Sequence, residues 1–301
     1  MALTVIGTVA LDTVETPFGK LTEGLGGSAT HFSAAASFFS PIGLVAVIGE
    51  DFPEKYLDFF RSRPINLEGL AKIPGRSFRW TGRYDHDMNV AHTLETQLNV
   101  LLQFNPEVPA SQKKNKFVFL GNIDPKLQSK VIDQVEGKPF IAADTMNFWI
   151  DGSRPDLLEM LKRVDMLVIN EGEARALAGE SNLLKASRTI RNMGPKHLVI
   201  KRGEYGALAF YEDQIFNAPA LPLEDIQDPT GAGDSFAGGM MGYLAKINST
   251  SFQDIKKAII YGSVMASFMV EKFSLDRLRR LNDAEINDRF LRFSELTHFE
   301  R

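Results

Sequence analysis

The chain has 301 residues, a net charge of −4 and no cysteine, with 44% hydrophobic and 24% charged residues. The lack of cysteine excludes disulfides, thiolate metal sites and a cysteine nucleophile. The composition is that of a globular protein, and the mild acidity offers no basic footprint for nucleic acid. The KKNK cluster at 113–116 is therefore interpreted as a solvated loop.

The N-terminal segment MALTVIGTVALD carries no basic region and reaches an acid at Asp12, so it predicts a strand rather than a signal peptide. No apolar run approaches the ~20 residues needed to span a bilayer. We therefore expect a cytoplasmic protein with neither a membrane nor a nucleic-acid partner.

Short apolar runs alternate with amphipathic segments along the chain. The apolar runs predict strands at 3–10, 43–49, 116–122, 139–145, 165–170, 197–203 and 206–212. The amphipathic segments predict helices at 29–39, 53–63, 125–136, 154–164, 171–179 and 182–194. Continuous apolar strands are typical of a parallel sheet buried on both faces. The alternation predicts an α/β fold with a doubly wound, mostly parallel sheet flanked by helices.

Two stretches interrupt this rhythm, at 12–24 and 77–104. Both are polar, turn-rich or alternating, and neither contains a clear crossover helix. We interpret them as a small β lid, which leaves 1–11, 25–76 and 105–301 as the nucleotide- and substrate-binding core. The alternative is a β-meander packed on the edge of the main sheet.

The segment DPTGAGDSFAGG (228–239) places two carboxylates around a glycine-bearing turn before an apolar helix. Backbone N–H groups of Gly231, Ala232 and Gly233, together with a helix N-terminus, would form an anion cradle. Asp234 beside that cradle could act as general base towards a hydroxyl. Such a site suits phosphoryl transfer, which depends mainly on positioning and charge stabilisation.

A purely structural interpretation is also open, because Asp is a favoured N-cap and Gly a common turn residue. The chain contains no Walker loop. The GLGGSA segment at 24–29 imitates a dinucleotide fingerprint, but it does not follow a convincing strand and is not taken as one.

The full DPTGAGDSFAGG segment resembles the C-terminal signature of the ribokinase, or PfkB, family of carbohydrate and nucleoside kinases. GGSATH at 26–31 is similar to the family's N-terminal signature, NEGE at 170–173 to its NxxE motif, and KRGEYG at 201–206 to its xxGxxG element. The resemblance extends from about residue 3 to 280. It implies a ribokinase-like fold and a β lid at the two interrupting stretches.

The resemblance implies a nucleotide site. Asp234 would be the base, and the N–H groups of Gly231, Ala232 and Gly233 would hold the transferring phosphate. Asn170 and Glu173 would organise Mg²⁺ and phosphates, with Glu173 acting through water. The other residues implied to border the nucleotide are Lys201, Gly203, Gly206 and Ser263.

Several of these residues also suit simpler structural roles, and those alternatives stay open. Asn170 and Glu173 could form only a helix capping box. Lys201 could face solvent at a strand end, Gly206 could serve only a turn, and Ser263 could belong to a helix core.

The resemblance also implies an acceptor site formed by Asp12, Gly26, Gly27 and His31. Asp12 would bind hydroxyls, and the two glycines would let the backbone approach the ring. His31 stands where many members have Asn, so the acceptor could differ from plain ribose or fructose; it could equally be a helix residue covering the sheet. Asp144 and Asn147 resemble an acid-x-Asn element, with one residue more between them.

Asp228 matches a position that binds a monovalent cation in several family members. Phe273 replaces the glycine expected in the loop that completes that site, which speaks against activation by potassium. The polar residues of the lid could close on the acceptor or could form an exposed strand face; they are Arg79, Arg83, Asp85, His86, Asp87 and Asn89.

The sequence therefore predicts an ATP- and Mg²⁺-dependent kinase that phosphorylates a hydroxymethyl group of a sugar. The alternatives are a nucleoside kinase of the same family and a non-catalytic nucleotide- or sugar-sensing protein. The resemblance also implies a homodimer formed through the β lid. The sequence names neither the acceptor nor the hydroxyl.

Overall fold

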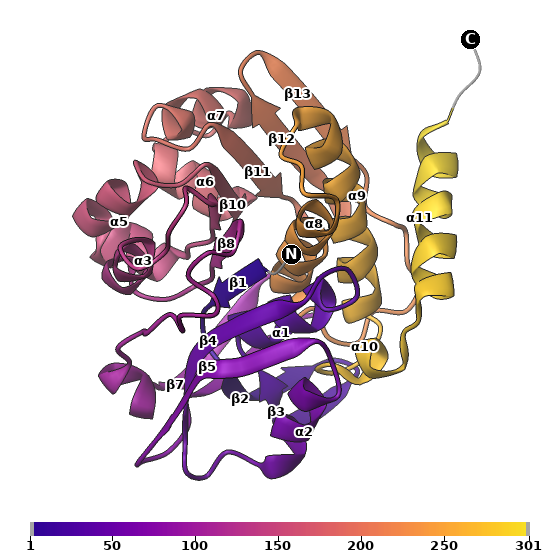
Figure 1. Ribbon diagram of the computed structural model, residues 1–301. Helices are drawn as coiled ribbons and strands as arrows, with labels where there is room; N and C mark the ends of the chain where they lie inside the picture. The colour runs from indigo at the N-terminus through magenta and orange to yellow at the C-terminus, as the bar shows by residue number, and fades with distance from the viewer. Residues whose placement is uncertain (1–2, 299–301) are drawn as a thin grey trace.

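The computed structural model describes residues 3–298, which form one large sheet and one small sheet (Figure 1). The strands of the large sheet are β1 (Leu3–Ile6), β4 (Ile42–Gly49), β5 (Ile65–Ile73), β8 (Phe117–Leu120), β9 (Phe140–Ala143), β10 (Met166–Asn170), β11 (His197–Lys201), β12 (Ala207–Tyr211) and β13 (Gln214–Ala218). Their order is β13-β12-β11-β10-β9-β8-β1-β4-β5. Neighbours are parallel from β11 to β5, and β12 and β13 are antiparallel at one edge.

Helices cover both faces of the large sheet (Figure 1). One hydrophobic layer packs under α1 (Ser28–Ala36), α2 (Glu54–Arg61), α8 (Ala232–Ile247), α9 (Phe252–Met269), α10 (Asp276–Arg280) and α11 (Asp283–Thr297). The other packs under α3 (Pro125–Ile132), α4 (Asn147–Gly152), α5 (Arg154–Leu161), α6 (Glu171–Ala178) and α7 (Leu183–Arg191). The predicted doubly wound α/β fold is confirmed.

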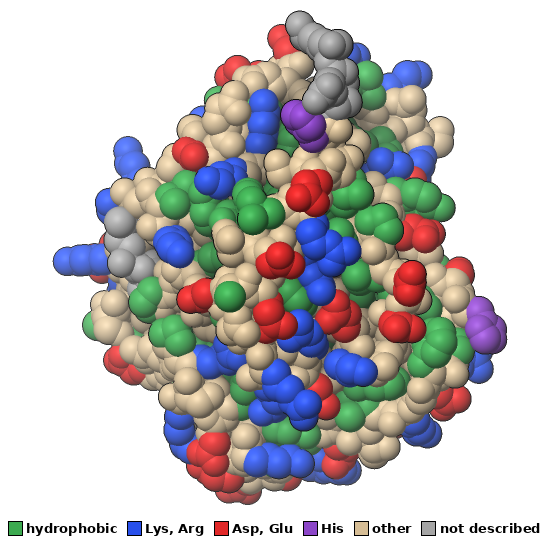
Figure 2. All heavy atoms as spheres, turned by 90° about the vertical axis from the view of Figure 1, so that its right-hand side faces the viewer, with side chains coloured by type: hydrophobic (Ala, Val, Ile, Leu, Met, Phe, Trp, Pro, Cys, Tyr) green, Lys and Arg blue, Asp and Glu red, His purple; other side chains and the backbone are tan. Residues whose placement is uncertain are grey.

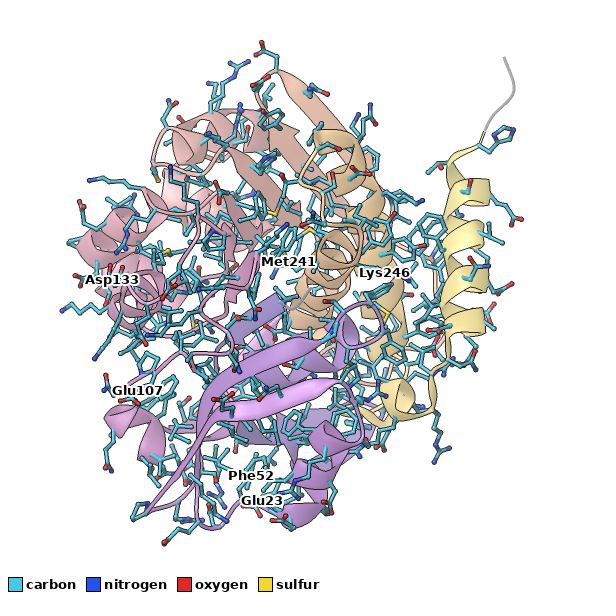
Figure 3. All side chains as sticks on the ribbon, viewed as in Figure 1. Glu23, Phe52, Glu107, Asp133, Met241 and Lys246 are labelled. Atoms are coloured by element: carbon cyan, nitrogen blue, oxygen red, sulfur yellow. The ribbon has the colours of Figure 1, made fainter. Side chains whose placement is uncertain are left out.

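Strand side chains alternate between these two layers because successive residues of a strand point to opposite faces. In β10, Met166 and Val168 join the first layer, whereas Leu167 and Ile169 join the second. Met241 of α8 lies inside the molecule in Figure 3 and is fully buried. The continuous apolar runs of the sequence therefore reflect burial on both faces.

The strand predicted at 3–10 is wrong in extent, because the chain leaves the large sheet after Ile6. There the Thr8 N–H donates to Ser28 Oγ (3.1 Å), and a Cβ on Gly7 would lie 2.7 Å from the same oxygen. This close approach lets the chain cross the start of α1 and enter the small sheet. Strands β5 and β13 were not predicted, since both are half-exposed edge strands with interspersed polar residues.

The small sheet contains β2 (Ala10–Thr16), β3 (Gly19–Gly26), β6 (Arg79–Tyr84) and β7 (Ala91–Gln97) in the order β3-β2-β6-β7. Because β2 and β6 run parallel, this sheet is not a meander on the edge of the large one. Residues 99–103, within the stretch expected to be lid, form a short 3-10 helix.

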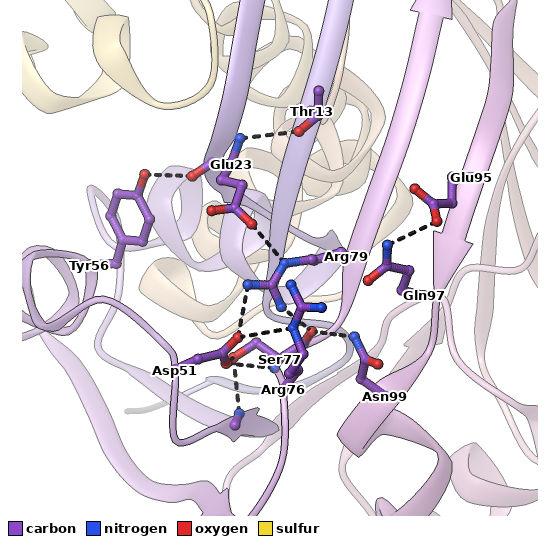
Figure 4. A network of polar contacts seen from close by, with 11 residues as sticks. Thr13, Glu23, Asp51, Tyr56, Arg76, Ser77, Arg79, Glu95, Gln97 and Asn99 are labelled. Atoms are coloured by element: carbon purple, nitrogen blue, oxygen red, sulfur yellow. Dashed lines mark hydrogen bonds and ion pairs between the residues drawn. The ribbon is translucent and has the colours of Figure 1, made fainter.

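A polar network fastens one end of the small sheet to the loop after β4 (Figure 4). Arg79 of β6 donates to Glu23 of β3 at 2.8 Å and pairs with Asp51 at 2.8 Å. Asp51 also accepts the N–H and the hydroxyl of Ser77 at 2.7 and 2.8 Å. Because Arg79 is only 13% exposed and doubly paired, its charge is already committed. Arg79 therefore anchors the small sheet and is not free to close on the acceptor.

The face formed by α9 and α11 carries acidic and basic side chains side by side (Figure 2). Glu271 pairs there with Arg277 and Arg289, at 2.8 and 2.7 Å, which ties α11 to the end of α9. Across residues 3–298, no helix has both the length and the apolar character required to cross a membrane.

Candidate active site

Polar and charged side chains gather at the carboxyl ends of three neighbouring parallel strands. Asp144 directly follows β9, Asn170 ends β10 and Lys201 ends β11. Asn170 and Lys201 are register partners. Open α/β sheets bind their ligands at this edge, where crossover loops leave a crevice.

Helix α8 begins at the same edge with Gly231 as its N-cap, in the left-handed region at φ +75°. Asp234 is therefore the third helical residue and not the cap that the structural alternative required. The Ala232 N–H donates to the Pro229 carbonyl at 3.1 Å, whereas the N–H groups of Gly231 and Gly233 make no hydrogen bond within residues 3–298. Of the three residues predicted to form the anion cradle, only Ala232 therefore has its N–H bonded within the described residues.

Lys201 lies inside the charged cluster and does not face solvent. Its Nζ is 3.3 Å from Asp144 Oδ2, and its side chain is 16% exposed. A Cβ placed on Gly233 would lie 3.0 Å from the same ammonium. The glycine thus allows a lysine from the sheet to reach the start of α8.

Burial, and then the charge of Asp144, raise the pKa of Asp234 to about 7, against the opposing charge of Lys201. Burial and the charge of Asp144 likewise raise the pKa of Glu173 to about 7. Burial lowers the pKa of Lys201, but the charges of Asp144 and Glu173 outweigh it, so this pKa is raised. Asp234 is thus poised to exchange a proton near neutral pH, beside a permanent cation.

Asn170 and Glu173 form the capping box that the structural interpretation predicted. The Asn170 N–H donates to Glu173 Oε2 at 2.7 Å, and the Glu173 N–H donates to Asn170 Oδ1 at 2.8 Å. These bonds fix Glu173, which is 8% exposed, at the start of α6. Its Oε1 is the kind of oxygen that Mg²⁺ or its bound water prefers, so the capping role and a metal role are compatible.

Asp12, Gly26 and Gly27 meet where the small sheet joins α1. The Gly27 N–H donates to Asp12 Oδ2 at 3.3 Å, and a Cβ on Gly26 would lie 1.9 Å from that oxygen. Gly27 has φ +94°. Burial raises the pKa of Asp12 to about 7; the Gly27 N–H opposes this, and the charges of Asp228 and Asp234 add to it. The three predicted residues therefore form one unit that holds a buried carboxylate.

His31 of α1 packs directly against the turn before α8. A Cβ on Gly231 would lie 2.3 Å from the imidazole ring, so only glycine fits there. The ring is 2% exposed, and neither nitrogen finds a hydrogen-bond partner in the described part of the chain. Burial lowers the pKa of His31 to about 4, which keeps the ring neutral.

Tyr84 is a site residue that the sequence analysis missed. It ends β6, is 9% exposed and accepts a hydrogen bond of 3.4 Å from the Thr230 hydroxyl. Burial raises its pKa to about 12. In the sequence, Tyr84 is only an aromatic residue at the end of an alternating strand. Such a residue is equally typical of the buried face of any sheet.

Beyond β6, Asn89 reaches the turn after β11. Its amide is 3.5 Å from Glu204 Oε1, and a Cβ on Gly203 would lie 2.9 Å from Asn89 Oδ1. The turn between β6 and β7 thus spans the site from the Thr230 side to the Gly203 side.

Ser263, Asn147 and Gly206 make no hydrogen bond or ion pair with Lys201 or Asp144 in residues 3–298. Ser263 is buried in α9, and Asn147 is exposed at the start of α4. Gly206 has φ +83°, and a Cβ there would lie 2.0 Å from the Ala218 carbonyl, which explains it as a turn residue. Asp144, rather than Asn147, connects the segment after β9 to the cluster.

Asp228 is fully buried, and both of its carboxylate oxygens accept backbone N–H groups. Oδ1 accepts from Thr230 at 2.9 Å and Oδ2 from Ser274 at 3.1 Å. Phe273 packs against the hydrophobic cluster beneath the small sheet. Both Asp228 oxygens therefore have a backbone partner, although burial still raises the pKa of this carboxyl against the opposing bonds from Thr230 and Ser274.

We therefore expect turnover to be independent of potassium. Replacing potassium by tetramethylammonium should leave kcat within about twofold, because Phe273 packs into the hydrophobic cluster and backbone N–H groups already bond both oxygens of Asp228. The measurement is ADP release in each salt at equal ionic strength. Stimulation by potassium of tenfold or more would contradict this prediction.

Residues 3–278 match the family described as pfkB family carbohydrate kinase. The chain belongs to the PfkB family. The match covers both sheets and all the residues of the candidate site. The chain is therefore a kinase of the ribokinase type, which explains the doubly wound sheet with a separate small sheet.

Known kinases are similar to the chain over most of its length. It is 33% identical to the cytidine kinase of Thermococcus kodakarensis over 79% of the chain and 87% of that protein. It is 32% identical to the 2-dehydro-3-deoxygluconokinase of Thermoproteus tenax over 77% of each chain. Among solved structures, an Escherichia coli protein assigned as a ribokinase II, in complex with ATP and Mg²⁺, has a TM-score of 0.79 at 17% identity, covering 96% of this chain and 99% of that one. At that identity the likeness shows a shared fold.

Proposed function

We propose that the protein transfers the γ-phosphoryl group of ATP to the hydroxymethyl group of a neutral nucleoside, with Asp234 as general base. The observation that carries this is the position of Asp234. It lies one residue beyond the unbonded N–H of Gly233 and beside the ammonium of Lys201. A base, an anion cradle and a cation are the minimum parts of phosphoryl transfer.

In the proposed step, Asp234 accepts the proton of the acceptor hydroxyl. The hydroxyl oxygen forms a bond to the γ-phosphorus, and the bond from that phosphorus to the β–γ bridging oxygen breaks. The bonding electron pair leaves with ADP. The N–H groups of Gly231 and Gly233 stabilise the charge that develops on the phosphoryl oxygens.

Glu173 and Asn170 are the residues that would hold Mg²⁺, through water or through Glu173 Oε1. The bound ion supplies charge neutralisation of the phosphate oxygens. The capping box keeps Glu173 in place before any ligand arrives, so the site needs little reorganisation.

Three carboxylates around the acceptor favour a neutral molecule. The charges of Asp228 and Asp234 already raise the pKa of Asp12. Of the nearby arginines of the small sheet, Arg79 is paired closely with Asp51 and Glu23, whereas Arg83 is half-exposed and only 3.7 Å from the exposed Asp85. An acceptor with its own carboxylate would add repulsion, whereas a nucleoside would not.

A sugar kinase is the second candidate, since the chain is also similar to a 2-dehydro-3-deoxygluconokinase. A neutral sugar would meet the same pocket without repulsion; a sugar acid would not. A homodimer formed through the small sheet and a cytoplasmic location remain predictions.

The deciding experiment measures ADP release from Mg·ATP with cytidine, adenosine, inosine, ribose, fructose and 2-dehydro-3-deoxygluconate. We expect kcat/KM for one nucleoside to exceed that for the sugar acid by at least about 100-fold, as one uncompensated charge in a buried site requires. Preference for the sugar acid would overturn the proposed acceptor. Bound ATP with no turnover across the panel would favour a sensing protein.

The raised pKa of Asp234 predicts a pH dependence. The base must be ionised to accept a proton, so kcat/KM for the acceptor should be level above pH 7 and fall about tenfold per unit below it. An aspartate at its ordinary pKa would give a level profile down to about pH 5. The check is kcat/KM from pH 5 to 9 at saturating Mg·ATP. A profile that stays level to pH 5 would rule out the raised pKa.

A further inference from the structure

Lys201 is placed as a fixed cation beside the start of α8. It lies next to Asn170 in the register of the sheet, and its Nζ is 3.3 Å from Asp144 Oδ2. A Cβ on Gly233 would come within 3.0 Å of the ammonium. The cation thus stands against the backbone whose N–H groups form the anion cradle.

Asp144 is itself held rigidly. It is 5% exposed, its Oδ1 accepts the Thr145 N–H at 2.8 Å, and its carbonyl accepts from Gln128 Nε2 at 3.0 Å. These bonds leave Oδ2 to bind Lys201. An ammonium has three N–H donors, so the bond to Asp144 leaves donors for a second anion.

We propose that Lys201 binds a non-bridging oxygen of the γ-phosphoryl group during transfer, and that Asp144 is the positioning residue that holds the ammonium there. The inference rests on the proposed function and adds a catalytic residue to it. Charge spreads over the three equatorial oxygens in the transition state, so a fixed cation lowers the barrier. Asp144, Glu173 and Asp234 would otherwise present only negative charge to the arriving phosphate.

The alternative is that Lys201 only neutralises the buried Asp144. The double variant Lys201→Met/Asp144→Asn separates the two roles, because it removes both charges and leaves neither unpaired. If Lys201 contacts the phosphoryl group, kcat of this variant falls about 10²- to 10³-fold while its melting temperature stays near that of the wild type. Lys201→Arg should recover part of the lost kcat.

Nucleotide affinity provides a test that needs no acceptor. Calorimetric titration should show that the double variant loses at least tenfold in affinity for Mg·ATP and less than twofold for Mg·ADP, which lacks the γ-phosphoryl group. If the double variant keeps the wild-type affinity for Mg·ATP and its kcat stays within threefold of the wild type, the proposed role of Lys201 is overturned, and only that role. If the wild-type protein binds neither nucleotide, the proposed function fails as well. If it binds ATP but phosphorylates no nucleoside, only the acceptor assignment fails, and the titration still decides the role of Lys201.

Discussion

Replacing Asp234 by asparagine should lower kcat by roughly 10²- to 10⁴-fold, the contribution typical of a general base. Asparagine keeps the shape of the side chain but accepts no proton from the acceptor hydroxyl. Because the cradle and Lys201 are unchanged, the affinity for Mg·ATP should stay within about threefold. Turnover by ADP release and affinity by calorimetry measure the two quantities separately.

Asp254→Asn is the matched control, since Asp254 is the third residue of α9 just as Asp234 is the third residue of α8. Its carboxylate accepts from the hydroxyls of Ser249 and Ser251, away from the charged cluster. This variant should turn over like the wild type. If Asp234→Asn keeps more than a tenth of wild-type kcat, Asp234 is not the base.

Replacing Gly231 by alanine should lower kcat by roughly 10²-fold. A Cβ at this position would lie 2.3 Å from the buried His31 ring, and the ring has no room to move because it is enclosed. The turn must then shift, which displaces the N–H donors that face the phosphate, and the loss of one such donor costs roughly 10²-fold or more. The measurement is kcat at saturating acceptor and Mg·ATP.

Gly179→Ala separates this effect from backbone strain. Gly179 ends α6 in the same left-handed region, at φ +66°, and nothing lies within 4 Å of a Cβ there. Gly179→Ala should lose about 1–2 kcal/mol of unfolding free energy from the left-handed strain, and Gly231→Ala should lose more because of the His31 contact, but only Gly231→Ala should lose turnover. Adding His31→Ala to Gly231→Ala should restore part of kcat by making room. Equal kcat in the two glycine variants would show that the contact with His31 is unimportant.

The pattern of apolar residues predicted well those strands of the large sheet that are buried on both faces. Strands such as β10 place hydrophobic residues on both faces, and a short continuous apolar run between turn signals is typical of such a strand. The edge strand β5 was missed because INLEGLAKI mixes polar and apolar residues, as an exposed loop also does. The break after Ile6 depends on the contact between Gly7 and Ser28, which are 21 residues apart and show no local signal.

The candidate site could be predicted where its residues lie close together in the sequence. DPTGAGD contains the turn, the helix start and the carboxylate proposed as the base within seven residues, and the structure brings them together with Lys201. The pairing of Lys201 with Asp144 was not predictable, because it joins two strand ends that meet only in the folded sheet. Tyr84 was equally hidden, since the pairing of distant strands sets where β6 ends.

The attachment of the small sheet limits how it can move. Its base is fastened twice, through Asp12 to Gly27 at the start of α1 and through Arg79 to the loop after β4. Thr16 and Tyr84, at the opposite end, are bonded to Gln227 and Thr230. Beyond Tyr84, the tip of the β6–β7 hairpin makes one hydrogen bond outside the small sheet among residues 3–298, the 3.5 Å contact between Asn89 and Glu204. A rigid swing of the whole sheet would pull the Asp12 carboxylate away from Gly27 and so disrupt the acceptor pocket. Opening should therefore be a bend of the hairpin tip, so that molecules enter between this tip and the turn at Gly203 while Asp12 and Gly27 keep their positions.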